Sequence, residues 1–118
     1  MAVENDLLIQ FRKSGEISVL GLSGDVDVYT CSILRDAIIH SIDQGDQRMV
    51  INMANVNYID SSGLGTLVGG LRRVKQNDGH LAISSATPRI RKVLKITGLN
   101  KVFTIFEDED SAVRSLDT

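Results

Sequence analysis

The sequence predicts an α/β domain in which an N-terminal β-hairpin precedes alternating strands and helices around a mixed sheet. Three observations lead to this prediction. Apolar residues alternate with period two in residues 7–22, the apolar period changes to that of a helix after Thr30, and strand-like and helix-like segments then alternate to the C-terminus. A hairpin followed by β-α units implies later strands that are mainly parallel, with about four helices. With 118 residues, the chain is expected to form a single domain over residues 1–118.

The first elements are a hairpin and a helix. Strands are predicted at residues 7–11 and 17–22, with the turn at residues 13–16. The side chain of Thr30 is predicted to cap the first helix, and Gly45 to end it. The apolar stripe of this helix comprises Ile33, Leu34, Ala37, Ile38 and Ile42.

The middle of the chain repeats this alternation of strand and helix. Residues 48–53 are nearly all apolar until Asn52, as expected of a strand that is buried on both faces. A second helix follows and ends near residues 77–79, before a strand at residues 80–84. The apolar stripe of the second helix comprises Leu64, Leu67, Val68, Leu71 and Val74.

The C-terminal part carries clear start and stop signals. Thr87 provides a capping hydroxyl for a third helix, Pro88 occupies its first position, and Gly98 closes it. Residues 102–106 are predicted to form the last strand. Residues 108–116 begin with three acidic residues and are predicted to form a short terminal helix.

Composition limits the classes of function. A formal net charge of −2 gives no general attraction to nucleic acid or to an anionic membrane, and no apolar run approaches the length of a transmembrane helix. Residues 1–6 carry no apolar signal region. A lone thiol, Cys31, can form neither an internal disulfide nor a cysteine-based metal site and fits a reducing compartment. The protein is therefore expected to be cytoplasmic, with no nucleic-acid or membrane partner.

The most unusual junction between a strand and a helix is at residues 57–65. Asp60 or Ser61 can cap the second helix, and an ordinary cap is the simplest explanation. However, Gly63 and Gly65 lie in the first turn, where each costs about 1 kcal/mol relative to alanine. Their bare backbone would let another molecule approach closely, so this segment is a candidate binding site. Two hydroxyls also lie at the positive end of the helix dipole, where a phosphate is tolerated.

The same segment resembles a known family. Residues 58–65 look like the D-S-[ST]-G-L-G phosphorylation motif of single-domain STAS proteins that act as anti-sigma factor antagonists. Residues 24–30 are similar to the G-x-[LIV]-D segment of that family, and residues 96–103 resemble the segment before its last strand. The resemblance covers nearly the whole chain, with the elements in the same order, and it implies the STAS fold.

The resemblance also implies a partner-switching function. The unphosphorylated antagonist binds an anti-sigma factor that is an ATP-dependent serine kinase, and this frees the sigma factor. The kinase then phosphorylates the serine after the motif's aspartate, here Ser61, and a separate serine phosphatase resets the switch. Ser62 is not the expected acceptor. The implied partner-binding residues are Asp27, Asp60, Ser61, Ser62, Gly63 and Gly65.

The sequence leaves two alternatives open. An enzyme or nucleotide binder is weakly supported, because the Gly63-x-Gly65-x-x-x-Gly69 spacing misses the dinucleotide fingerprint and no G-x-S-x-G elbow is present. His40 and His80 lack clustered partners, so no catalytic residue, metal or cofactor is expected. A second alternative is a STAS scaffold or accessory subunit of a signalling assembly or transporter. Neighbouring genes for a serine kinase or for a transporter would discriminate between these.

Overall fold

The structure, a computed structural model, describes residues 6–117 and confirms the predicted α/β fold with a mixed sheet. Residues 1–5, in which no export signal was predicted, lie outside the described residues. The sheet has the strand order β1-β2-β3-β4-β5; β1 pairs antiparallel with β2, and the remaining pairs are parallel. The elements are β1 (Leu7–Ser14), β2 (Ile17–Val26), α1 (Cys31–Asp43), β3 (Arg48–Ile59), α2 (Ser61–Gln76), β4 (His80–Ser84), α3 (Pro88–Ile96), the 3₁₀ helix η1 (Leu99–Lys101), β5 (Thr104–Phe106) and α4 (Glu109–Leu116).

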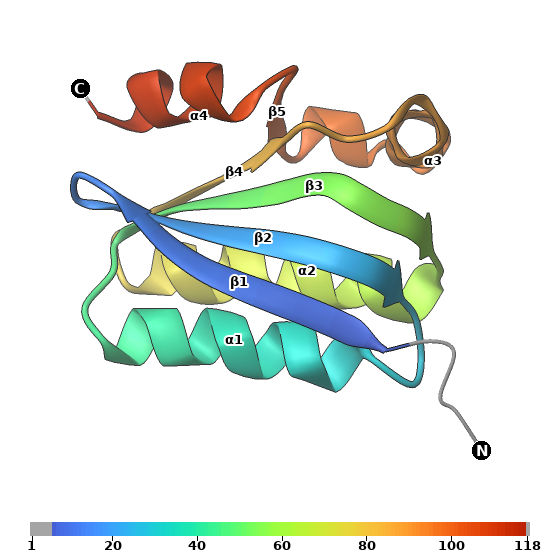
Figure 1. Cartoon of the computed structure of the whole chain (residues 1–118), viewed down its shortest axis with the longest axis horizontal. Coiled ribbons are helices and arrows are strands. Elements are labelled where there is room, and N and C mark those ends of the chain that lie inside the picture. The colour runs from blue at the N-terminus through green and yellow to red at the C-terminus, as the bar shows by residue number, and fades with distance from the viewer. Residues whose placement is uncertain (1–5, 118) are drawn as a thin grey trace.

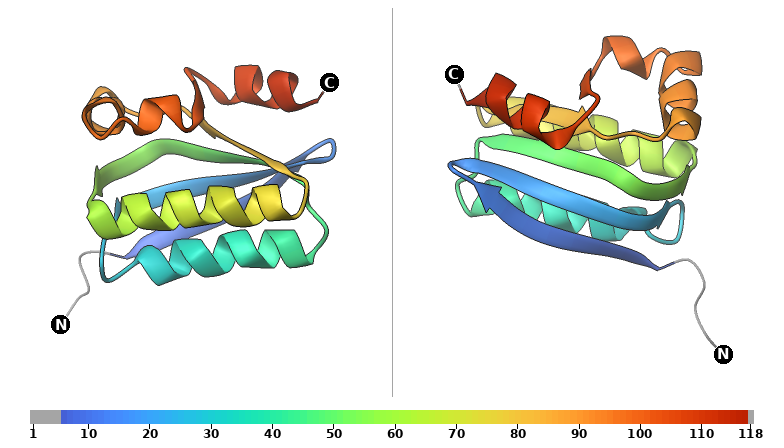
Figure 2. Two further views of the ribbon diagram at one scale, coloured as in Figure 1. Left: turned by 180° about the vertical axis from the view of Figure 1, so that it is seen from behind. Right: turned by 45° about the horizontal axis from the view of Figure 1, so that its top comes forward.

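The helices form layers on the two faces of the sheet. Helices α1 and α2 lie side by side on one face, and α4 lies on the other (Figures 1 and 2). Met49, Val50 and Ile51 of the central strand β3 are fully buried, as predicted for a strand covered on both faces. On the α4 side, Ala112 packs against a small cluster of Ile17, Val19 and Val50.

The predicted strand at residues 48–53 is too short: β3 continues to Ile59. Its second half pairs in parallel with β2, which itself runs on to Val26, and the pairing contains two register shifts. Residues such as Asn55 and Asn57 in this extension are exposed, so they show no apolar signal. The extension of both strands brings their carboxyl ends together beside the start of α2.

The predicted last strand at residues 102–106 is too long. Gly98 adopts a left-handed conformation with φ of 78° and leads into η1, while the amide of Phe103 donates to the carbonyl of Leu99. The first two residues of the predicted strand are therefore occupied by a helical turn, and β5 begins at Thr104. Val102 is left 49% exposed at this point.

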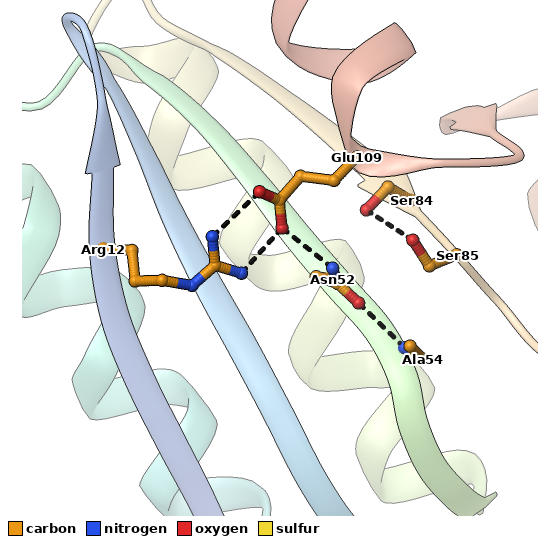
Figure 3. Close-up of polar contacts among 6 residues, drawn as sticks. All are labelled: Arg12, Asn52, Ala54, Ser84, Ser85 and Glu109. Atoms are coloured by element: carbon orange, nitrogen blue, oxygen red, sulfur yellow. Dashed lines mark hydrogen bonds and ion pairs between the residues drawn. The ribbon is translucent and has the colours of Figure 1, made fainter.

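A charged network fastens the start of α4 to the sheet (Figure 3). Arg12 of β1 donates two hydrogen bonds, of 2.8 and 2.6 Å, to the carboxylate of Glu109. The side-chain amide of Asn52 donates a third, of 2.8 Å. At the other end of α4, Arg48 donates to the carbonyl of Leu116 at 2.9 Å. Polar contacts thus hold both ends of a helix whose apolar contact with the sheet is small.

Replacing Glu109 by glutamine is expected to destabilise the protein in a pH-dependent way. The hydrogen bond from Arg12, opposed by desolvation and supported by Asn52, lowers the pKa of Glu109 from 4.5 to about 2. Because the folded pKa is depressed, the stabilisation is present above pH 4.5 and is lost as the pH falls towards 2. The Arg12 side chain is 39% exposed, so solvent screening reduces the expected loss at pH 7 to about 1–2 kcal/mol.

Denaturant unfolding at pH 7 and near pH 2 would check this expectation. The matched control is Glu107→Gln, since the Glu107 side chain is 87% exposed and its ion pair with Arg91 is 3.8 Å long. The control should change stability little at either pH. Equal stability of Glu109→Gln and the unmodified protein at pH 7 would contradict the role given to the network.

Candidate functional site

The candidate site lies where β2 and β3 end and α2 begins. Val26 and Ile59 are paired at the ends of these parallel strands, and the amide of Asp60 donates to the carbonyl of Val26 at 3.1 Å. Asp60 is the N-cap of α2, and its Oδ1 accepts from the amide of Gly63 at 3.0 Å. Of the two predicted cap residues, the structure therefore selects Asp60, and Ser61 is the first residue of the helix.

The side chain of Ser61 is accessible to solvent. The residue is exposed, and its hydroxyl forms no hydrogen bond with any of residues 6–117. The neighbouring Ser62 is half-buried, and its carbonyl accepts a hydrogen bond from the Thr66 hydroxyl. Ser61 is thus the more accessible of the two hydroxyls and lies at the positive end of the helix dipole.

The Asp60 carboxylate joins two segments that are distant in the sequence. While Oδ1 caps α2, Oδ2 accepts from the amide of Val28 at 3.2 Å. Val28 belongs to the loop between β2 and α1, here called the 27–30 loop. A single side chain therefore sets the position of this loop relative to Ser61.

The 27–30 loop is held internally by Asp27. Its Oδ1 accepts from the amides of Tyr29 and Thr30, at 2.9 and 3.1 Å, and only 7% of the residue is exposed. The resemblance implies a partner-binding role for Asp27; in the free chain its carboxylate is bonded to the backbone of this loop. Thr30 occupies the predicted N-cap position of α1, but its hydroxyl makes no capping hydrogen bond and instead donates to the carbonyl of Asp25 and accepts from the amide of Asp27.

The two glycines of the motif have different surroundings. Gly63 is buried, and a Cβ atom there would lie 2.5 Å from the Val26 carbonyl oxygen and 2.8 Å from Ile59 Cγ1. Close packing of α2 on the strand ends therefore explains why position 63 is a glycine. Close approach by another molecule is not needed to explain it. Gly65 is exposed, and nothing lies within 4 Å of a Cβ atom added to it. The fold gives no reason for glycine at position 65.

Three large, exposed side chains lie on the segments that adjoin the Asp60 cap, and the sequence interpretation did not assign them to the site. Val28, Tyr29 and Tyr58 are 61%, 82% and 49% exposed. Val28 is tied directly to Asp60, and Tyr58 precedes Asp60 by two residues. Tyrosine is enriched in protein interfaces. The sequence did contain one signal for this surface, since Val28 and Tyr29 are two large apolar residues between a predicted strand and a predicted helix.

A groove of about 290 Å³ runs from Ser61 between α1 and α2. Gly65 and Gly69 form part of its α2 wall, and Arg35 and Arg73 lie along it. Gly70 also allows the two helices to approach, since its added Cβ would lie 2.6 Å from Ile38 Cδ1. Within residues 6–117, His, Cys, Asp and Glu side chains nowhere form a group of three or more that could hold a metal ion.

Comparison with known proteins decides the family. A family model described as the STAS domain matches residues 9–112. This chain belongs to the STAS domain family. The anti-sigma-B factor antagonist of Staphylococcus epidermidis is 37% identical to this STAS protein over 73% of the chain and 80% of the relative.

Solved structures share the STAS fold. An anti-sigma factor antagonist from Mycobacterium paratuberculosis superposes with a TM-score of 0.89 at 22% identity, over all of both chains. The Bacillus cell fate determinant SpoIIAA in its phosphorylated form superposes with a TM-score of 0.71 at 25% identity, over 92% of this chain and 98% of that one. In the part of this STAS protein that the structure describes, no helix combines the length and apolar character needed to span a membrane.

Proposed function

We propose that this STAS protein is an anti-sigma factor antagonist that is switched by phosphorylation of Ser61. Its unphosphorylated form binds a cognate anti-sigma factor that is also a serine kinase, and the sigma factor is released. Phosphorylation ends the complex, and a serine phosphatase restores the binding form. The observation that carries this proposal is the exposed, unbonded hydroxyl of Ser61 directly after the Asp60 cap. The similarity to the anti-sigma-B factor antagonist of Staphylococcus epidermidis supports the general role.

The proposed partner surface is centred on Ser61. Val28, Tyr29 and Tyr58, on the segments that adjoin the Asp60 cap, supply its exposed apolar area, and Gly65 places no side chain on the adjacent turn of α2. Asp60 lies at the edge of this surface, with both carboxylate oxygens used by backbone amides. Asp27 and Gly63 contribute from beneath, by holding the 27–30 loop and the start of α2, and Ser62 lies beside the acceptor.

The charges favour loss of binding on phosphorylation. A phosphate adds about −1.5 to −2 charges at neutral pH. In the free protein it is hydrated and gains about 0.3–1 kcal/mol from the helix start. In a complex it would lose water next to the Asp60 carboxylate and apolar side chains. Phosphorylation is therefore tolerated by the fold and opposed by the interface.

In this proposal the protein acts by binding, in the cytoplasm, as one domain over residues 1–118. It is not expected to catalyse a reaction or to use a cofactor. The partner would be identified by pull-down from native lysate with Ser61→Ala as bait, followed by mass spectrometry. Recovery of a serine kinase supports the proposed switch, whereas recovery of a transporter or of a large signalling assembly without a kinase favours the accessory or scaffold role.

Incubation with that kinase and ATP is expected to add a single phosphate, on Ser61. The reason is that Ser61 is exposed at the start of α2 whereas Ser62 is half-buried. Intact mass and peptide mapping would measure the number and position of phosphates. Ser61→Ala should accept none, and Ser62→Ala, the matched control, should still accept one. A phosphate mapped to Ser62 or to a distant serine would refute the assignment.

A further inference from the structure

A second surface lies on the C-terminal half of α2, away from Ser61. Two adjoining hollows, of about 390 and 260 Å³, lie between α2 and the segment that leads into β5. Leu71, Lys75 and Val102 line both hollows, so the two form a continuous recess. We call it the α2–β5 recess.

The recess is largely apolar along α2 and mixed in character towards β5. Val68 and Leu71 of α2 form one side, and Val102 forms the other. The second hollow continues to Phe106 of β5 and Leu116 of α4, and the polar residues His80, Thr104 and Ser115 also line it. Val102 is half exposed because the turn through η1 holds it outside the sheet. The recess can therefore bury an apolar side chain of another molecule, which would remove this surface from water.

The charge around the recess has one sign. Arg72 and Lys75 line it, and Lys101 adjoins Val102; all three are exposed. None of the three forms an ion pair within the described part of the chain. No Asp or Glu side chain lines either hollow. Since the whole chain has a formal charge of −2, this is a local concentration of positive charge.

The recess is separate from the proposed switch surface. Lys75 follows Ser61 by fourteen positions in one helix, which corresponds to about 21 Å at 1.5 Å per residue. No residue that lines the recess also lines the groove beside Ser61. A molecule bound in the recess would leave the Ser61 hydroxyl accessible.

We propose that the α2–β5 recess binds an acidic peptide segment of a partner protein that carries an apolar anchor residue. The anchor enters between Leu71 and Val102, and flanking carboxylates pair with Arg72 and Lys75. Apolar anchors in pockets with complementary charges at the rim are the usual design of a peptide-binding surface. A recess of this kind suits a peptide better than a membrane, since an interfacial membrane anchor needs a protruding apolar face.

The test uses the full chain and the synthetic peptide Glu-Glu-Leu-Glu-Glu-Leu-Glu-Glu, followed by amide NMR. Saturable shifts are expected around Leu71, Lys75 and Val102. Matched peptides with Lys in place of Glu, or with Ala in place of Leu, should bind at least about tenfold more weakly, a difference of about 1.4 kcal/mol. Lys75→Glu and Val102→Ser should weaken binding of the first peptide to a similar degree. Lys92→Glu, on the exposed surface of α3 outside the recess, should leave it unchanged.

Several results would overturn the proposal. They are the absence of saturable binding, shifts that map to the Ser61 region, or equal binding of the lysine peptide. Binding to phosphatidylglycerol vesicles that Lys75→Glu abolishes, without binding of the acidic peptide, would assign the recess to a membrane surface instead. Thermal melts of each variant establish that a loss of binding occurs in a folded protein.

Discussion

Ser61→Asp is expected to bind the cognate kinase far more weakly than the unmodified protein, whereas Ser61→Ala is expected to bind it nearly as well. Loss of the hydroxyl removes at most one hydrogen bond, worth about 0.5–1.5 kcal/mol. In the complex, a carboxylate at position 61 must lose water directly after the Asp60 carboxylate, in an interface proposed to include Val28 and Tyr29. A complete switch from bound to free requires about 5.5 kcal/mol, and a full phosphate charge should approach this value more closely than aspartate.

Calorimetric titration of the kinase with both variants would measure the effect, and melts would separate it from unfolding. Because Ser61 is the exposed first residue of α2, an acidic side chain there should not destabilise the fold. The matched control is Ser111→Asp, which places the same charge in the first turn of α4, on the opposite face of the sheet. Binding by Ser61→Asp that equals binding by Ser61→Ala would contradict the electrostatic argument.

Alanine substitutions at the two glycines of the motif are expected to have opposite effects on stability. Gly63→Ala would place a methyl group against the Val26 carbonyl, so the start of α2 must shift at a cost of about 1–3 kcal/mol. Gly65→Ala meets no neighbouring atom and should raise helix stability by up to about 1 kcal/mol. If Gly65 lies in the partner interface, the same change should weaken binding to the kinase despite the gain in stability.

Denaturant unfolding and titration of both variants would test this pair of expectations. Each variant is the control for the other, since both add one methyl group within the same turn of α2. Equal stability of Gly63→Ala and the unmodified protein would contradict the packing explanation for Gly63, because the strand ends would then accommodate a methyl group without cost. A Gly65→Ala variant that binds the kinase with unchanged affinity would remove Gly65 from the proposed interface.

Local signals in the sequence predicted much of the fold. Thr87 caps α3, Gly98 closes α3 in a left-handed conformation, and α4 begins in the predicted acidic segment. These features depend on residues that are close in the sequence, so they can be predicted from the sequence alone. The ends of β3 and β5 could not be predicted in the same way. The length of β3 depends on pairing with β2, and the start of β5 depends on the η1 turn.

The site was predicted less completely, because its arrangement depends on contacts between distant segments. The motif located Ser61 and Asp60, but only the structure connects Asp60 to Val28 across 32 positions. The burial of Asp27 and the packing reason for Gly63 also come from tertiary contacts. Exposure of Val28 and Tyr29 depends on how the 27–30 loop folds, so a search for motifs did not single them out.

A phosphate on Ser61 is expected to separate the protein from its kinase without altering the fold. The most direct test is a calorimetric titration of the kinase with the unmodified chain and with the enzymatically phosphorylated chain, after peptide mapping has placed the phosphate. Affinity is expected to fall by a factor on the order of 10⁴, equivalent to about 5.5 kcal/mol, while the melting curve changes little. Equal affinities for the two forms would contradict the switch, and loss of binding together with unfolding would contradict its mechanism.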